Sequence, residues 1–338
     1  MTRIGIIGLG FMGRTHYDTY QKVPGAQVVA VCDADPRRAA GDLSGGWGNI
    51  GGAGTQHLPM DRIKGYTDPR EMIANPDVDV VDVCLPTPAH VEVVTAALGA
   101  GKHVLCEKPM ARTAADARKI AAAAASAKGL FMPAMCMRFW PEWEWLKRAV
   151  AEEHYGKVRS AHFRRVAVMP KGWFSNGQMS GGALVDLHVH DTDFVYHLFG
   201  KPHGVFSRGH RGGSGEIDHV VTQYLFDGRS RDAVVVAEGG WSMSEGFPFT
   251  MRCTLNFERA TADFDISRKD TLILYGDGKS QVVEHAKHDG YTGELSYFLE
   301  CVRTGQKPDR VTADDAVAGL TIVEAEKRSA ESGQVVVV

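Results

Sequence analysis

The first 130 residues alternate short apolar runs, rich in β-branched residues, with longer stretches in which apolar positions recur at helical spacing. The apolar runs predict strands at residues 4–7, 28–32, 78–84 and 103–106. The intervening stretches predict helices at residues 13–22, 36–42, 69–74, 90–100 and 114–127. Strands that are apolar throughout and alternate with helices are typical of a parallel sheet covered on both faces. The pattern therefore predicts an α/β domain over residues 1–130 with a doubly wound parallel sheet.

The pattern changes after residue 130. A helix is predicted at residues 142–152, and extended runs then predict strands at residues 159–168, 219–226, 233–241, 251–257, 262–266 and 271–275. Asp227-Gly228 and Asp277-Gly278 stand where hairpin turns are expected. We expect residues 131–338 to form an α+β domain with a large, mostly antiparallel open sheet.

Composition narrows the class of protein. At roughly 150 residues per domain, the 338 residues provide a little over two domains. The 38 Lys and Arg residues against 41 Asp and Glu give a net charge of −3 at pH 7, and no basic run is present, so we expect no nucleic-acid partner. No apolar run reaches the ~18 residues of a membrane span, and the chain enters a predicted strand directly after its first residues, so we expect a cytoplasmic protein.

Cysteine and glycine usage add two expectations. The 6 cysteines form no CxxC pair, which argues against a zinc site or a disulfide framework and fits a reducing compartment. Glycine occupies seven of the fourteen positions at residues 41–54, which predicts a surface loop. The alternative is a loop that closes over the adenosine end of a cofactor.

The motif GLGFMG at residues 8–13 follows a predicted strand and opens a predicted helix. In that context, backbone N–H groups and the helix N-terminus hold a pyrophosphate. Gly8 allows the tight turn, Gly10 allows close approach of the phosphates, and Gly13 lets the helix pack on the strand. Asp33 ends the second strand twenty residues after Gly13, where a carboxylate binds the ribose hydroxyls of NAD and disfavours NADP.

Two further segments lie at the same sheet edge. Lys108, within the sequence EKP at residues 107–109, follows the strand at residues 103–106 and is expected to project from the carboxyl end of a parallel strand, where ligands bind. The sequence LPTPAH at residues 85–90 ends another strand there. The residues expected to contact the cofactor are Gly8, Gly10, Phe11, Met12, Gly13, Asp33, Arg37, Pro86, Thr87, His90, Glu107 and Lys108. Arg37 and Arg38 are the candidates for pairing with a 2′-phosphate, should the cofactor be NADP.

The order and spacing of these motifs resemble those of the Gfo/Idh/MocA family of nicotinamide-dependent oxidoreductases. The sequence GGALVDLHVHD at residues 181–191 resembles the glycine-led DxxxH segment of that family. The resemblance implies a Rossmann domain followed by a substrate-binding domain whose open sheet often builds oligomers. It also implies that Lys108, Asp186 and His190 occupy the catalytic positions, and that the substrate is a sugar, a polyol or a cyclitol.

The DxxxH segment has two interpretations. As a strand it would place Asp186, His188 and His190 on one face, which suggests a metal site at His188, His190 and Asp193. Apolar residues continue at helical spacing to Gly200, however, so we expect one helix from near Gly182 that carries Asp186 and His190 on a shared face, and no metal.

The expected chemistry is oxidation of a secondary alcohol. His190 would accept the hydroxyl proton, Lys108 would stabilise the negative charge that develops on the reacting oxygen, and Asp186 would orient His190. The residues expected to bind substrate are Lys108, Arg138, Trp173, Asp186 and His190, and Phe174, Asn176 and His162 lie where a sugar pocket could be lined.

Two other functions remain open at this stage. Some members of the family retain NAD and use transient oxidation to cleave a glycosidic bond without net redox change, and a non-catalytic NAD-binding sensor is a third reading. An open sheet with apolar residues on both faces, as at residues 233–237, also predicts a homodimer or homotetramer.

Overall fold

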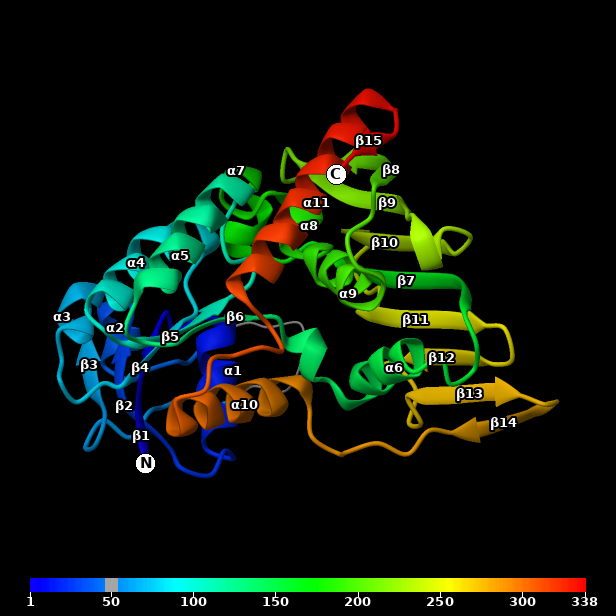
Figure 1. The fold of residues 1–338 in the computed structure, drawn as a ribbon. Coiled ribbons are helices and arrows are strands. Elements are labelled where there is room, and N and C mark those ends of the chain that lie inside the picture. The colour runs from blue at the N-terminus through cyan, green and yellow to red at the C-terminus, as the bar shows by residue number, and fades with distance from the viewer. Residues whose placement is uncertain (46–53) are drawn as a thin grey trace. The chain divides into compact units, whose positions relative to one another are not determined.

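The computed structural model describes residues 1–45 and 54–338, which form two compact units (Figure 1). The first unit comprises Met1–Phe139 and Asp289–Val317, and the second comprises Trp140–His288 and Ala318–Val338. The sequence pattern predicts a single boundary near residue 130, whereas the chain returns to the first unit for α10 (Gly290–Thr304). α10 packs against α1 (Phe11–Tyr20) through its buried side, and helical periodicity alone does not reveal which sheet a helix covers.

The first unit is built on a six-stranded parallel sheet in the order β3-β2-β1-β4-β5-β6. Its strands are β1 (Thr2–Ile7), β2 (Ala26–Cys32), β3 (Lys64–Tyr66), β4 (Val80–Val83), β5 (His103–Glu107) and β6 (Phe131–Ala134). Its other helices are α2 (Pro36–Ala39), α3 (Pro69–Ile73), η1 (Thr87–Ala89), α4 (His90–Gly99), α5 (Ala114–Ser126) and η2 (Cys136–Phe139). The strand order reverses direction between β1 and β4, the point at which sheets of this type bind ligands.

The buried strands of this sheet follow the apolar runs of the sequence. β4, for example, is buried along its whole length. The helices begin where the sequence offers a capping side chain: Asp35 caps α2, Asp68 caps α3 and Thr113 caps α5. The sequence pattern missed β3 and β6, because one is a three-residue edge strand containing a glycine and the other contains Pro133. The doubly wound parallel sheet is confirmed.

The second unit is built on a nine-stranded sheet in the order β14-β13-β12-β11-β7-β10-β9-β8-β15. Only the β7–β10 pair is parallel. The strands are β7 (Val158–Val168), β8 (Gly204–Arg211), β9 (Ile217–Leu225), β10 (Val234–Met243), β11 (Thr250–Phe257), β12 (Thr261–Asp265), β13 (Leu272–Gly276), β14 (Lys279–Val282) and β15 (Val336–Val337). This confirms the predicted open, mostly antiparallel sheet.

The helices of the second unit lie on one face of this sheet (Figure 1). They are α6 (Pro141–Ala151), η3 (Gly172–Ser175), α7 (Gly177–Ser180), α8 (Gly182–Asp186), α9 (Val189–Phe199) and most of α11 (Ala313–Ser332), whereas η4 (Gly228–Ser230) lies in the connection between β9 and β10. The hairpin at Asp277-Gly278 is confirmed, because both residues have positive φ (51° and 70°) and join β13 directly to β14. Asp227-Gly228 instead begins a longer connection that contains η4.

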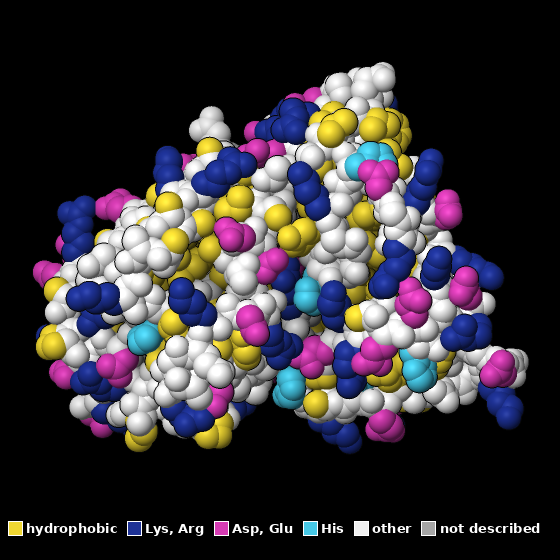
Figure 2. Space-filling model, in the orientation of Figure 1, with side chains coloured by type: hydrophobic (Ala, Val, Ile, Leu, Met, Phe, Trp, Pro, Cys, Tyr) yellow, Lys and Arg dark blue, Asp and Glu magenta, His cyan; other side chains and the backbone are white. Residues whose placement is uncertain are grey.

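The opposite face of the second sheet is partly exposed. It carries ion pairs, such as Arg164 with Glu238 at 2.8 Å, and exposed apolar side chains, Val221 at 40% and Val234 at 47%. Basic and acidic side chains are interspersed over the face of the molecule that Figure 2 shows. Among the described residues, no helix combines the length and the apolar character needed to span a membrane.

Candidate active site

The glycine turn after β1 has the geometry that its sequence predicts. Gly8 has a φ of 92°, and a Cβ there would lie 2.5 Å from the carbonyl oxygen of Cys84. A Cβ on Gly13 would lie 1.8 Å from the carbonyl oxygen of Gly8, so α1 approaches the turn more closely than any side chain allows. A Cβ on Gly10 would meet nothing within 4 Å. The turn therefore leaves open space at the N-terminus of α1, which fits a pyrophosphate.

Asp33 follows β2 and is held against this turn. Its Oδ2 accepts a hydrogen bond from the Leu9 N–H (2.8 Å), and its Oδ1 accepts one from the Asp35 N–H (2.9 Å). Arg38 Nη1 lies 3.8 Å from Asp33 Oδ2, whereas Arg37 reaches Asp42 at 3.5 Å. Of the two arginines, Arg38 is thus the one beside the carboxylate, and the fixed carboxylate fits the ribose hydroxyls of NAD.

Part of the glycine-rich stretch at residues 41–54 lies outside the described residues. At its end, the Thr55 N–H donates to Asp18 Oδ2 (3.1 Å), which attaches this end of the stretch to α1.

The segments after β4 and β5 are joined by His90. This side chain is buried, with Nδ1 3.0 Å from the carbonyl oxygen of Pro109 and Nε2 2.8 Å from that of Leu85. Burial lowers the pKa of His90. Both ring nitrogens face backbone carbonyls, so His90 supports the loops of the site from within, which differs from the direct cofactor contact expected. Pro86 precedes η1, and Thr87 at its start is buried.

Lys108 stands directly after β5 and is half-buried. Its backbone N–H donates to Glu107 Oε2 (2.9 Å), and the Lys108–Pro109 peptide bond is cis. Glu107 is itself buried, and its Oε1 lies 3.1 Å from His16 Nε2. The carboxylate of Glu107 therefore faces the interior of the first unit, which differs from the cofactor contact expected for it.

Arg138 is engaged within the first unit. Its guanidinium is buried, donates to the carbonyl oxygen of Arg310 (3.0 Å) and lies 3.2 Å from Asp315 Oδ2. Arg138 therefore joins two segments of the first unit, and its predicted role in substrate binding stays a prediction.

Asp186 and His190 lie in two short helices of the second unit, and the prediction of one continuous helix is wrong. α8 ends at Asp186, α9 begins at Val189, and the His188 N–H donates to the carbonyl oxygen of Ala183 (2.8 Å), five residues back. Leu187 and His188 keep right-handed helical angles, so the irregularity is local, like the bulges that are frequent at functional sites. Asp186 is buried and His190 is half-buried in the first turn of α9.

His188 lies at this irregularity, and its side chain is fully buried. Its Nε2 lies 3.3 Å from the Tyr224 hydroxyl and 3.6 Å from Glu326 Oε1. Burial alone would lower the pKa of His188, but the Glu326 carboxylate raises it. Periodicity did not show this, because Glu326 lies more than a hundred residues away in the sequence.

The other candidates of the second unit are dispersed. Within residues 140–288 and 318–338, all of them described, no three His, Cys, Asp or Glu side chains bring ligand atoms within 4.8 Å of one another, and this includes His188, His190 and Asp193. Trp173 stacks on Phe174 with ring centroids 4.1 Å apart. Asn176 caps α7, and His162 is exposed on β7.

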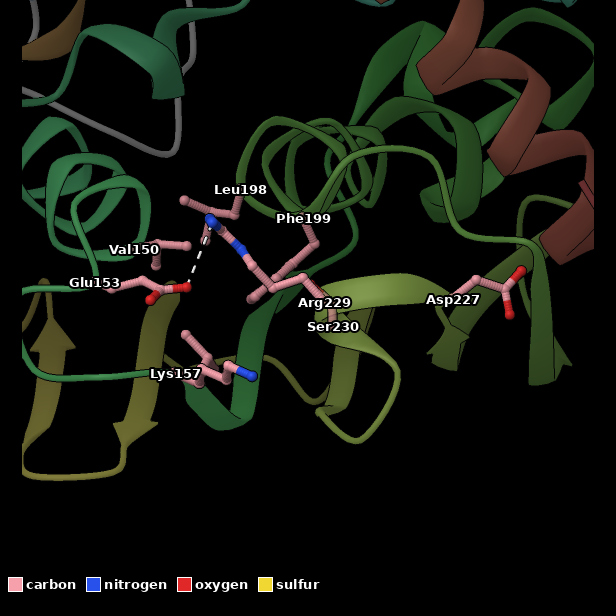
Figure 3. Close-up of a pocket in the computed structure, with 9 residues that line it drawn as sticks. Val150, Glu153, Lys157, Leu198, Phe199, Asp227, Arg229 and Ser230 are labelled. Carbon is pink, nitrogen blue, oxygen red and sulfur yellow. Dashed lines mark ion pairs between the residues drawn. The ribbon is translucent and has the colours of Figure 1, made fainter.

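A surface pocket of the second unit contains none of the predicted site residues. Figure 3 shows Arg229 reaching towards Glu153 across it, with Nη1 and Oε1 3.4 Å apart. Its lining comprises Val150, Glu153, Lys157, Val158, Leu198, Phe199, Asp227, Arg229 and Ser230.

The sequence pattern also missed a buried polar network in the first unit. It joins His16, Asp82 and Glu107, and Glu294 lies buried in the same unit. The available signal was Asp82, an acidic residue inside an otherwise apolar strand, since such a group is buried only with a partner.

A parallel sheet of order 3-2-1-4-5-6 with a glycine turn and an acidic residue after β2 defines a dinucleotide-binding domain. A family model described as "Oxidoreductase family, NAD-binding Rossmann fold" matches residues 2–135, and the GFO/IDH/MocA C-terminal domain matches residues 143–263. The chain belongs to the Gfo/Idh/MocA family, and its N-terminal domain is an NAD-binding Rossmann domain.

Several relatives match the chain over nearly its full length. Myo-inositol 2-dehydrogenase of Thermotoga maritima is 28% identical over 97% of this chain and 96% of its own. D-apiose dehydrogenase of Paraburkholderia graminis is 26% identical over 98% of this chain and 88% of its own. The structure of a probable dehydrogenase from Thermotoga maritima covers 99% of this chain and 98% of its own, with a TM-score of 0.80 and 26% identity.

Levoglucosan dehydrogenase, solved with NADH and levoglucosan, has a TM-score of 0.84 over 100% of this chain and 99% of its own. At 22% identity, this likeness establishes the fold alone.

Proposed function

We propose that this protein is an NAD-dependent dehydrogenase that oxidises a secondary alcohol of a sugar, polyol or cyclitol. The observation that carries the proposal is the presence of Lys108, Asp186 and His190 in a chain that matches polyol and sugar dehydrogenases over nearly its full length. The glycine turn and Asp33 support NAD, because the open space beside Gly10 admits a pyrophosphate and the fixed carboxylate would repel a 2′-phosphate.

In this proposal, each polar residue has one task. NAD, when bound, accepts the hydride from the carbinol carbon. His190 accepts the hydroxyl proton as that hydride leaves, so that the alcohol becomes a carbonyl. Lys108 donates a hydrogen bond to the reacting oxygen and stabilises its developing negative charge. Asp186 orients the imidazole of His190.

We further propose that the second unit binds the substrate and mediates self-association. Trp173, half-buried and stacked on Phe174, offers the flat apolar surface on which sugar rings pack. The partly exposed face of the nine-stranded sheet carries Val221 and Val234, which a second copy of the chain would cover.

The experiment that tests the function measures NADH formation with a panel of polyols and sugars, with NAD and NADP in parallel. We expect turnover with NAD and a loss of about a hundredfold or more in kcat for His190→Ala and Lys108→Ala. His210→Ala, an exposed histidine of β8, serves as the matched control and should retain the wild-type rate.

Full activity of either active-site variant would overturn the role assigned to that residue. Release of a leaving group from a glycoside without net NADH would replace the dehydrogenase by a redox-assisted lyase or hydrolase.

A further inference from the structure

His16 lies at the centre of a buried polar network in the first unit. Its side chain is fully buried on α1, which covers the sheet beside α10 (Figure 1). Nδ1 is hydrogen-bonded to Asp82 Oδ2 on β4 at 2.8 Å, whereas Nε2 lies 3.1 Å from Glu107 Oε1 on β5 as an ion-pair contact without hydrogen-bond geometry. One imidazole therefore lies between two carboxylates that belong to neighbouring strands.

Asp82 only accepts hydrogen bonds, so it requires a proton on Nδ1 of His16, and the charges of two nearby carboxylates favour the positively charged form of the imidazole. Burial alone would lower the pKa of His16, but the charge of Asp82 and its hydrogen bond raise it well above its ordinary value. Asp82 is held in turn, because the Tyr20 hydroxyl donates to Asp82 Oδ2 (2.9 Å).

The remaining groups around His16 do not supply a competing positive charge. Cys84 Sγ lies 3.5 Å from Nδ1, and burial raises the pKa of this thiol, which keeps it neutral. The rings of Tyr20 and Tyr291 have their centroids 6.4 Å from that of His16. Burial raises the pKa of Glu294 well above its usual range, with a further contribution from Glu107, so Glu294 is neutral as well.

Glu107 connects this network to the candidate active site. Its Oε1 faces His16, and its Oε2 accepts the hydrogen bond from the Lys108 N–H (2.9 Å). An ionised carboxylate accepts this bond more strongly than a neutral one, and it is buried at acceptable cost only beside a cation.

We propose that His16 is a positioning residue that holds the buried side chain of Glu107 in place and thereby fixes the backbone of Lys108. The inference rests on the proposed role of Lys108 at the reacting oxygen. A shift of the Lys108 backbone would move its ammonium group away from the reacting oxygen. A displacement of 1 Å in such a group lowers the rate by about a hundredfold.

The test uses His16→Gln in the full-length protein, which removes the charge and keeps a polar side chain. We expect kcat to fall by roughly ten- to a hundredfold, while the Kd for NADH, measured by cofactor fluorescence, stays close to that of the wild type. His103→Gln is the matched control, because His103 is half-buried at the opposite end of the same strand β5, and this variant should keep the wild-type kcat.

Two readouts distinguish positioning from a general structural effect. ¹⁵N NMR of histidine-labelled wild-type protein should show the signal of a doubly protonated imidazole at pH 8 that is absent from His16→Gln and lost in Asp82→Asn. In a double-mutant cycle, His16→Gln combined with Glu107→Gln should lower kcat no further than the worse single variant, because each change breaks the same pair.

A neutral His16 imidazole in the wild type, additive losses in the cycle, or an unchanged kcat in folded His16→Gln would each overturn the inference. The inference would also be overturned if His16→Gln lost NADH affinity and kcat by the same factor and had a lower Tm, because these losses together indicate a general structural effect. If His16→Gln fails to fold, the ¹⁵N signals of the wild type and of Asp82→Asn show whether His16 carries the charge that the inference requires. Wild-type activity of Lys108→Ala would instead defeat the proposed function, whereas inactive Lys108→Ala with fully active His16→Gln would defeat only this inference.

Discussion

At the scale of single residues, the carboxyl group of Glu294 lies fully buried in the first unit, and neither of its oxygens has a hydrogen-bond partner among the residues that the structure describes. Burial raises the pKa of this group well above its usual range in the folded protein, and the nearby charge of Glu107 adds to the effect. The unfolded chain releases the proton near the ordinary value for glutamate. Between these two pKa values, the folded state binds one proton more than the unfolded state.

This difference gives Glu294 a defined effect on stability. Its favourable contribution is complete below the unfolded pKa and is lost as pH rises towards the folded pKa, by about 1.4 kcal/mol for each pH unit. Glu294→Gln is neutral at every pH and lacks this loss. We therefore expect its Tm to rise relative to that of the wild type between pH 5 and pH 8, as measured by thermal unfolding.

The matched control is Glu300→Gln on the same helix. Glu300 is exposed, and its pKa is lowered mainly by its hydrogen bond with Arg303, so its removal should give no such gain at high pH. A difference in Tm between Glu294→Gln and the wild type that stays constant across this pH range would show that Glu294 is not protonated in the folded protein.

At the scale of elements, Gly13 and Gly10 are needed for different reasons: Gly13 for the packing of α1 and Gly10 for the space beside the turn. At Gly13, a Cβ would collide with the Gly8 carbonyl and force the helix off the strand, whereas at Gly10 it would project into open space. We expect Gly13→Ala to destabilise the protein without cofactor by about 1–3 kcal/mol, the cost of overpacking, in a urea titration.

Gly10→Ala provides the complementary case. It should leave the stability of the cofactor-free protein close to that of the wild type and weaken NADH binding by about tenfold or more, because the methyl group fills the space that a pyrophosphate needs. Wild-type NADH affinity in Gly10→Ala would place the cofactor away from this turn.

The irregular junction of α8 and α9 is also stabilised by contacts with other elements. The Arg165 side chain of β7 donates to both carboxylate oxygens of Asp191, at 2.8 Å and 3.2 Å, in the interior beside His190. Together with His188, this pair anchors the first turn of α9 to the sheet and to α11. A repeat of apolar residues predicts helix here correctly, but it carries no information about such distant polar anchors.

At the scale of the whole molecule, the nine-stranded sheet has one face under helices and one face partly exposed. If a second copy covers that face, light scattering should give the mass of a dimer or tetramer. Val221→Glu combined with Val234→Glu, which adds charge beside Glu238, should then shift the protein towards the monomer.

Val335→Glu is the control for this prediction, because Val335 is exposed outside the sheet and should leave the mass unchanged. A monomeric wild-type protein would remove the self-association proposal and leave the NAD-binding domain and its chemistry untouched.

Local sequence determined what depends on neighbouring residues. The apolar runs specified most strands of the parallel sheet, the glycines of residues 8–13 specified a turn that no side chain tolerates, and Asp277-Gly278 specified a hairpin with two positive φ angles. These features follow from periodicity and backbone sterics, which a short segment carries within itself.

Only the tertiary structure decided the features that join distant segments. It assigned α10 to the first unit, turned Glu107 towards His16, committed Arg138 to Asp315, and interrupted the helix between Asp186 and His190 where His188 meets Glu326. The last three of these outcomes depend on which buried polar side chain finds a partner, because an unpaired charge in the interior costs more than local propensity can offset. That choice is made between residues far apart in the chain, and therefore no local pattern records it.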